Sequence, residues 1–243
     1  MKEKLYTIPV NEAFEKDDEC AFCVLTEKLE DDILNYILGP SYMEEDVREN
    51  TDKMGFCKGH YRQMYQAQNR LGVALMVDTH LKKWCGEMEA LLDAELALPK
   101  KKGLFKKEEV PSAYLERSHE MRGSCYACAR MQGRMDSYVD TFFYLWKNEE
   151  AFRRKVVAGR GFCLEHFDLI LSEGKRRLSD EKYRDLAAAL IPVQKENFQR
   201  LIKEVDWFVQ KFDYRFRDEP WGTSEDSVMR AIRKLAGIDP ERI

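Results

Sequence analysis

One arrangement of cysteines and histidines occurs twice in this chain, and it constrains the fold more than any other feature. Each copy has a Cys-x-x-Cys pair, then a spacer of 33 or 34 residues, then a cysteine within Gly-Phe-Cys-x-x-His. The copies use six of the seven cysteines and two of the four histidines. The side chains are Cys20, Cys23, Cys57 and His60 in the first copy and Cys125, Cys128, Cys163 and His166 in the second. Three thiolates and one imidazole form the ligand set of a closed tetrahedral zinc site.

The repeat also predicts the domain organisation. A shift of about 105 residues aligns the two copies, with one extra residue in the second, so we expect an internal duplication. Between the copies lies a lysine-rich stretch with prolines at both ends, which is typical of an exposed linker. The predicted parts are a first helical unit (1–98), a linker (99–112), a second helical unit (113–213) and a C-terminal tail (214–243). The tail contains a short amphipathic pattern from about Ser224 to Ala236.

Apolar residues recur every three or four positions through most of the sequence, as in helices that bury one face. From Ala74 to Leu98 the spacing follows a heptad, and pairing of this helix between two chains would make a homodimer. Pro192 interrupts a long helical pattern and predicts a kink or a break. Because no segment alternates with a period of two, we expect an all-α fold. The predicted architecture is two duplicated helical units, each with a Cys3His metal site, plus a C-terminal helix.

The ligand number favours a structural role for both predicted zinc ions. Four protein ligands leave no open position, whereas catalytic zinc normally keeps one for water or substrate. In Cys-x-x-His the two side chains share one face of a helix's first turn, and the helix dipole there favours a thiolate. We expect Gly55 and Gly161 to permit a tight turn into that helix, and Phe56 and Phe162 to cover the sites.

The cofactor, the role of the thiolates and the pairing of the ligands stay open at this point. An iron–sulfur cluster is an alternative to zinc, because it is also held by cysteines. The thiolates can also form a redox or metal sensor that releases its ion on oxidation. The duplication favours a site within each copy, with Cys20, Cys23, Cys57 and His60 on one ion. A crossed arrangement, in which each Cys-x-x-Cys pair joins the other copy's Cys-x-x-His, is the alternative.

Motifs for catalysis are missing from the sequence. It has no glycine-rich phosphate loop, no nucleophile elbow and no histidine placed for a triad, so we assign no catalytic residue. His80, His119 and the seventh cysteine, Cys85, fall outside the repeat, and we interpret them as ordinary structural residues.

The composition argues against some classes of partner and indicates the expected cellular compartment. A formal net charge of −4 argues against non-specific nucleic-acid binding, which depends on neutralising phosphates. The longest apolar stretch, Leu71–Val77, is too short to cross a bilayer, and the N-terminus shows no signal-peptide pattern. We therefore expect a cytoplasmic protein, in a reducing compartment where cysteines bind metals rather than form disulfides.

Several stretches resemble an uncharacterised bacterial family, a domain of unknown function. The resemblance lies in the opening Tyr6–Phe14 segment, the first Cys-x-x-Cys pair, the Gly39–Met43 turn and the Gly-Phe-Cys-x-x-His elements, and it covers most of residues 6–213. It implies no activity and no catalytic residues. The resulting prediction is a non-enzymatic zinc-binding helical scaffold or interaction module, whose partner is a protein or a small ligand.

Overall fold

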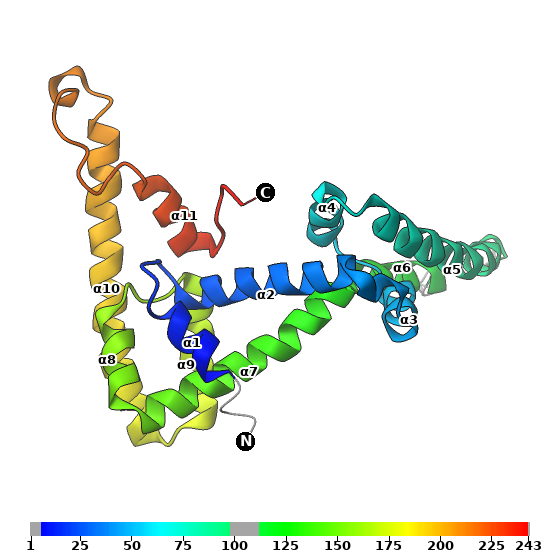
Figure 1. Ribbon diagram of the computed structural model, residues 1–243, viewed down its shortest axis with the longest axis horizontal. Coiled ribbons are helices and arrows are strands. Elements are labelled where there is room, and N and C mark those ends of the chain that lie inside the picture. The colour runs from blue at the N-terminus through cyan, green and yellow to red at the C-terminus, as the bar shows by residue number, and fades with distance from the viewer. Residues whose placement is uncertain (1–5, 98–111, 243) are drawn as a thin grey trace, which may run out of the picture. The chain divides into compact units, whose positions relative to one another are not determined.

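The computed structural model describes residues 6–97 and 112–242, and its elements are helices. They are α1 (Thr7–Ala13), α2 (Ala21–Leu38), α3 (Glu45–Met54), α4 (Lys58–Gln66), α5 (Arg70–Leu96), α6 (Ala113–Gly123), α7 (Tyr126–Asn148), α8 (Glu150–Ala158), α9 (Leu164–Arg177), α10 (Asp180–Gln210) and α11 (Ser227–Ala236), with 3-10 turns η2 (Pro40–Met43) and η3 (Tyr214–Phe216) (Figure 1). No β-strand occurs within the described ranges, so the all-α prediction is confirmed. Apart from Ser112, the predicted linker lies outside the described residues.

The chain folds into two compact units. Unit 1 combines residues up to Lys28 with those from Arg134 onward, and unit 2 runs from Leu29 to Gly133. The two boundaries fall within α2 and within α7, so each of these helices contributes residues to both units.

The core of unit 1 is aromatic. Phe22, Phe142, Phe152 and Phe162 are almost completely buried. Phe14 joins them, with ring centroids 5.2–6.1 Å from those of the other four. Aromatic pairs at these separations add to the hydrophobic stabilisation that burial supplies. Helices α8, α9 and α11 all contact α10 or each other, and Figure 1 shows α8 and α9 beside α10.

The core of unit 2 is mainly aliphatic. The second half of α2 buries Leu29, Ile33 and Ile37, which recur every four residues as in a helix that buries one face. Helix α5 packs against α3, α4 and α6. It buries Val73 and Met76, whereas Leu81 of the predicted heptad is 60% exposed.

Two further helix predictions can be compared with the structure. Helix α10 continues through Pro192 as one element instead of dividing there, with Leu190 and Val193 on either side buried. In the tail, α11 begins at Ser227 and contacts α9 and α10. Gly237 ends it in the left-handed conformation that glycine adopts readily.

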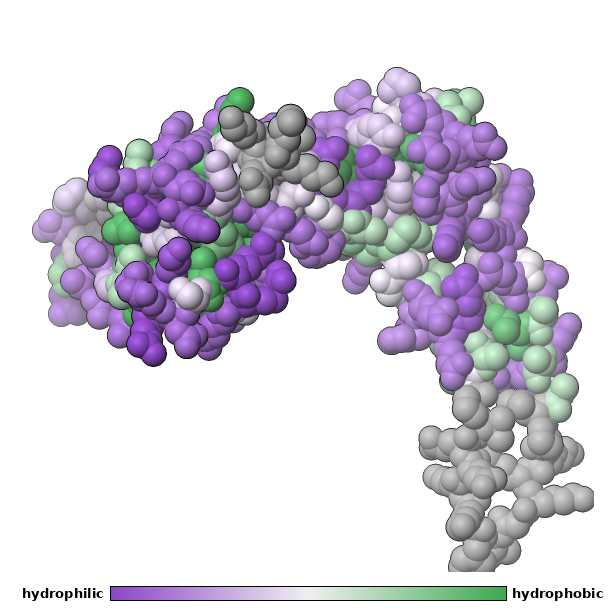
Figure 2. Space-filling view, turned by 90° about the horizontal axis from the view of Figure 1, so that it is seen from below, coloured by the Kyte–Doolittle hydropathy of each residue, from purple (hydrophilic) through white to green (hydrophobic). Residues whose placement is uncertain are grey.

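The surface in Figure 2 is mostly hydrophilic, with apolar side chains gathered in small patches. In the part of the chain that the structure describes, no helix combines the length and the apolar character needed to cross a membrane.

Candidate metal centres

Two groups of four side chains each bring three cysteine sulfurs and one histidine nitrogen together. The Cys20 group lies in unit 1 and consists of Cys20, Cys23, Cys163 and His166. The Cys57 group lies in unit 2 and consists of Cys57, His60, Cys125 and Cys128. In each group the four donor atoms all lie within 4.8 Å of one another. The structure thus places all eight predicted side chains in two compact groups.

In the Cys20 group, the histidine ring faces all three sulfurs. Nδ1 of His166 lies 3.1 Å from Sγ of Cys163, 3.4 Å from Sγ of Cys23 and 3.5 Å from Sγ of Cys20. The sulfurs of Cys23 and Cys163 are 3.5 Å apart. All four residues are buried.

The Cys57 group has the same geometry. Nδ1 of His60 lies 3.2 Å from the sulfurs of Cys57 and Cys125 and 3.4 Å from that of Cys128. The sulfurs of Cys57 and Cys128 are 3.8 Å apart. In this group Cys57 is only half-buried and Cys128 is exposed.

These separations fit a single tetrahedral ion. With metal–sulfur bonds of about 2.3 Å and metal–nitrogen bonds of about 2.0 Å, tetrahedral geometry sets sulfur–sulfur edges near 3.8 Å and sulfur–nitrogen edges near 3.6 Å. The observed distances of 3.1–3.8 Å lie at or slightly below those values. Either group can close around one ion with small shifts of its side chains.

The pairing is crossed between the two copies of the motif. The favoured expectation, one ion held within each copy, is wrong, because Cys20 and Cys23 meet Cys163 and His166 rather than Cys57 and His60. The physical reason is the path of the chain, since the first turn of α2 belongs to unit 1 whereas α4 belongs to unit 2. Each group therefore joins helices far apart in sequence, α2 with α9 and α4 with α7.

Each group forms where two helices begin. Cys57 and Cys163 are the N-caps of α4 and α9, and Cys23 and Cys128 lie in the first turns of α2 and α7. Helix N-termini favour negative charge, so these positions stabilise thiolates. The turns into α4 and α9 contain Gly55 at φ 57° and Gly161 at φ 77°. Both glycines thus have the positive φ expected of a tight turn.

A side chain from a neighbouring long helix braces each of these turns. Gln194 of α10 accepts a hydrogen bond from the backbone N–H of Phe162 at 3.0 Å and donates one to the carbonyl of Phe162 at 2.7 Å. In unit 2, the His80 ring packs beside Gly55, and its Nδ1 lies 2.8 Å from the carbonyl oxygen of Asp52. No sequence motif marks Gln194 or His80 for this role.

The surroundings of the two histidines differ. The His166 ring packs on Phe22, with ring centroids 5.6 Å apart. By contrast, Nε2 of His60 lies 3.3 Å from Oε1 of Glu30, an electrostatic contact whose alignment does not make a hydrogen bond. A carboxylate beside the non-ligating nitrogen commonly orients metal-binding histidines.

Before a metal binds, each group favours a thiolate beside an imidazolium. Hydrogen bonding to the Cys125 sulfur, followed by the electrostatic contact with the Glu30 carboxylate, raises the pKa of His60 to about 10. Burial raises the pKa of the Cys125 thiol, but hydrogen bonds from His60 and from the Cys128 backbone outweigh burial and bring it to about 6. Burial lowers the pKa of His166, and hydrogen bonds with Cys163 and Cys20 reverse this and raise it to about 10. Metal binding would displace the imidazole proton from Nδ1.

The tail covers the Cys20 group. A Cβ placed on Gly237, at the end of α11, would lie 3.3 Å from Sγ of Cys163 and 3.5 Å from Sγ of Cys23. Lys234, completely buried one turn earlier, donates hydrogen bonds to the carbonyls of Glu19 and Arg160. The sequence pattern predicts the amphipathic helix but gives no indication that it ends on the thiols.

Comparison with known proteins agrees with the resemblance noted in the sequence. Residues 1–242 match the model of a family described as a family of unknown function (DUF6062). The chain belongs to this family. A relative from Caldicellulosiruptor sp. (strain Rt8B.4), described as an uncharacterized 23.9 kDa protein in the xynA 3' region, is 23% identical over 203 residues, covering 82% of this chain and 85% of the relative. No solved structure matches this DUF6062 chain.

Proposed function

We propose that this protein is a non-enzymatic, zinc-binding helical scaffold that presents its helices to a protein or small-ligand partner. One observation carries the proposal: two separate groups each bring three cysteine sulfurs and one imidazole nitrogen within 4.8 Å of one another. Thiolate and imidazole ligands in a tetrahedron are the preferred surroundings of zinc. The reducing cytoplasm is the compartment that we propose, because it keeps such thiols available for metal.

The zinc ions would hold together parts of the chain that are far apart in sequence. In the Cys20 group the paired donors are separated by 140 to 146 residues, and in the Cys57 group by 65 to 71. Closing such long loops has an entropic cost, and ligation on the order of 10 kcal/mol per ion would offset it. That amount is comparable to the whole folding stability of a typical domain, which is about 5–15 kcal/mol.

The donor geometry supports a single ion in each group over an iron–sulfur cluster. In a cluster of two or four irons the four ligands are divided among at least two metal atoms, and the bridging sulfides occupy additional space. Here one histidine nitrogen lies within 3.5 Å of all three sulfurs of its group. Four protein donors also fill the coordination sphere, which supports a structural role over a catalytic one.

Metal analysis of the purified full-length protein tests the proposal. We expect two zinc ions per chain and no visible absorption. Cys163→Ala should retain one zinc, and Cys85→Ala, which changes the exposed cysteine outside both groups, should retain two. A coloured protein that contains iron, or full zinc content in Cys163→Ala, would contradict the proposal.

A second candidate function is a thiol-based redox or metal sensor, and the Cys57 group favours it. Its Cys128 is exposed and its Cys57 half-buried, whereas every member of the Cys20 group is buried. Peroxide can therefore reach the Cys57 group first. Oxidation would join two of its thiolates in a disulfide, reduce one hydrogen peroxide to water and release the ion.

Zinc release under mild peroxide distinguishes the two functions. A sensor should release one zinc per chain rapidly, recover it on thiol reduction and rebinding, and release none rapidly when Cys128 is replaced by alanine. If both ions leave together, only after the protein has unfolded, the scaffold function alone remains.

A further inference from the structure

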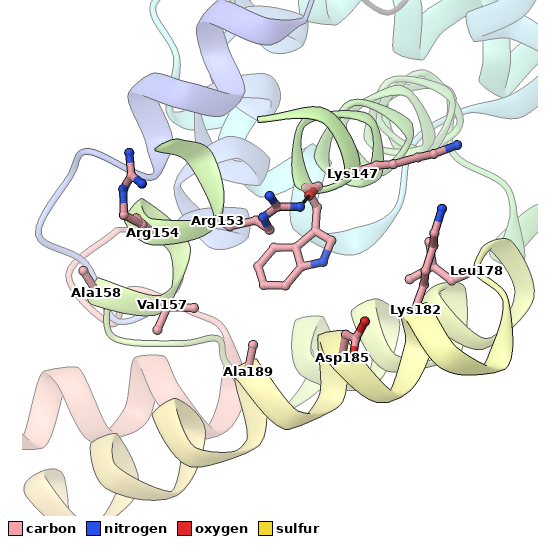
Figure 3. Close-up of a pocket in the computed structure, with 10 residues that line it drawn as sticks. Lys147, Arg153, Arg154, Val157, Ala158, Leu178, Lys182, Asp185 and Ala189 are labelled. Carbon is pink, nitrogen blue, oxygen red and sulfur yellow. Dashed lines mark hydrogen bonds between the residues drawn. The ribbon is translucent and has the colours of Figure 1, made fainter. Parts of the chain in front are cut away.

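Unit 1 contains a cavity whose lining includes no member of either cysteine group. It has a volume of about 670 Å³, within the range of about 300–1,000 Å³ found for small-molecule sites. Its walls come from the end of α7, the length of α8 and the first turns of α10 (Figure 3). No part of the proposed zinc scaffold requires a cavity here.

The inner surface of this cavity is mainly apolar. Trp146, Val157, Leu178 and Ala189 line it, and Val157 is 41% exposed although its neighbour Val156 is buried. The Trp146 ring is held in place by stacking on Phe142, with ring centroids 6.0 Å apart. The cavity therefore offers a preformed surface for an aromatic or aliphatic group.

The remaining lining is strongly basic. Lys147, Arg153, Arg154 and Lys182 line the cavity with a single acid, Asp185. Arg154 is balanced by an ion pair with Glu150, which leaves three cations against one carboxylate. Within the described ranges, Arg154 is the one cation of this lining that makes an ion pair. This local excess of positive charge contrasts with the net charge of −4 for the whole chain.

The position of Arg153 is fixed by the same wall. Its Nη1 donates a hydrogen bond to the carbonyl of Trp146 at 3.1 Å, drawn as a dashed line in Figure 3. In that view Lys182 extends from α10 toward the wall formed by α7, from which Lys147 also projects. An anion held between these groups would relieve the repulsion among like charges and accept charge-assisted hydrogen bonds.

From this combination we propose that the cavity binds a small amphiphilic organic anion. The apolar part of the ligand lies on Trp146, Val157 and Leu178, and its carboxylate, sulfonate or phosphate group interacts with Lys147, Arg153 and Lys182. Ala189, whose side chain points into the cavity in Figure 3, leaves the space that the apolar part fills.

Fluorescence titration with 8-anilinonaphthalene-1-sulfonate tests this site in the full-length, metal-loaded protein. The uncharged analogue 1-anilinonaphthalene serves as the matched probe. Lys147→Gln/Lys182→Gln removes charge at two exposed positions, and Ala189→Trp fills the cavity. Lys58→Gln/Arg122→Gln is the control variant, because these two cations line a separate apolar groove of about 440 Å³ in unit 2. Circular dichroism and zinc content confirm that each variant is folded.

We expect one saturable sulfonate site per chain. Lys147→Gln/Lys182→Gln should weaken its binding about tenfold, the sum of two modest charge contributions, and change binding of the uncharged probe by less than about twofold. Ala189→Trp should abolish binding of both probes, and the control variant should bind as the original protein does. The proposal is overturned if the folded protein shows no saturable binding. It is equally overturned if both cavity variants bind normally or if only Lys58→Gln/Arg122→Gln loses binding.

Discussion

Gly237 packs directly against the sulfur of Cys163, so that a Cβ added to the glycine would lie only 3.3 Å from that sulfur. The glycine also has φ 70°, a conformation that costs other residues about 1–2 kcal/mol. Two features therefore favour glycine at the end of the C-terminal helix: its positive φ, and the lack of room for a Cβ beside the candidate metal centre. This end of the helix shields two of the thiols, Cys23 and Cys163, from solvent.

Gly237→Ala should therefore destabilise the Cys20 group. Its methyl group presses on the Cys163 sulfur and its backbone is strained, so we expect faster zinc transfer from this group to a chelator. The loss of folding stability should be about 2 kcal/mol, measured by chemical denaturation.

The matched control is Gly222→Ala, at another tail glycine with positive φ. Gly222 has φ 59°, but a Cβ there would meet no atom within 4 Å. This variant should show the backbone cost without faster zinc transfer. Equal zinc kinetics in the two variants would show that contact with the sulfurs has no effect.

The crossed pairing predicts a distinctive pattern of metal content. Cys20→Ala/Cys163→Ala removes two ligands of one group and should retain one zinc per chain. Cys20→Ala/Cys57→Ala removes one ligand from each group and should retain none after chelator treatment. Pairing within each copy of the motif would reverse these two results, so elemental analysis of both variants decides between the arrangements.

The sequence predicts the ligand residues and the helices better than it predicts their meeting points. Cysteine and histidine spacing indicates which side chains can share an ion, and the positive φ of Gly55 and Gly161 agrees with the expected turns. Both pairings satisfy the same local spacing, however, because each needs one Cys-x-x-Cys and one Cys-x-x-His. The choice depends on tertiary packing, in which Phe22, two residues after Cys20, packs against Phe142 and Phe162 of the aromatic core.

The ion pair between Asp226 and Arg230, at the start of α11, predicts that the stability of this helix depends on pH. Hydrogen bonding to Arg230 lowers the pKa of Asp226 below its usual value of 3.8. A carboxyl whose pKa is lower in the folded state stabilises it fully above the unfolded value and loses that contribution as pH falls through the folded value. Because Asp226 is 55% exposed, the contribution should be only about 0.5 kcal/mol.

Thermal unfolding of Asp226→Asn tests this expectation. The variant should melt slightly below the original protein at pH 6–7, and the difference should shrink as pH falls below 3.8. Glu225→Gln, at the neighbouring exposed position, should show no such difference. A gap between Asp226→Asn and the original protein that widens toward low pH would contradict the assigned ion pair.

Gln194 offers a test of how firmly the turn into α9 must be held. Its side-chain amide bonds both the N–H and the carbonyl of Phe162, and all three groups are buried. Gln194→Ala leaves two backbone groups without partners, each costing about 1–3 kcal/mol, so we expect a loss of about 2–6 kcal/mol by chemical denaturation. Because Cys163 follows Phe162 directly, zinc affinity of the Cys20 group should fall as well.

The control is Gln199→Ala, an exposed change on the same helix, which should alter neither folding stability nor zinc affinity. If Gln194→Ala lowers stability but leaves zinc affinity unchanged, the ion itself holds the turn and the glutamine contributes only to the core.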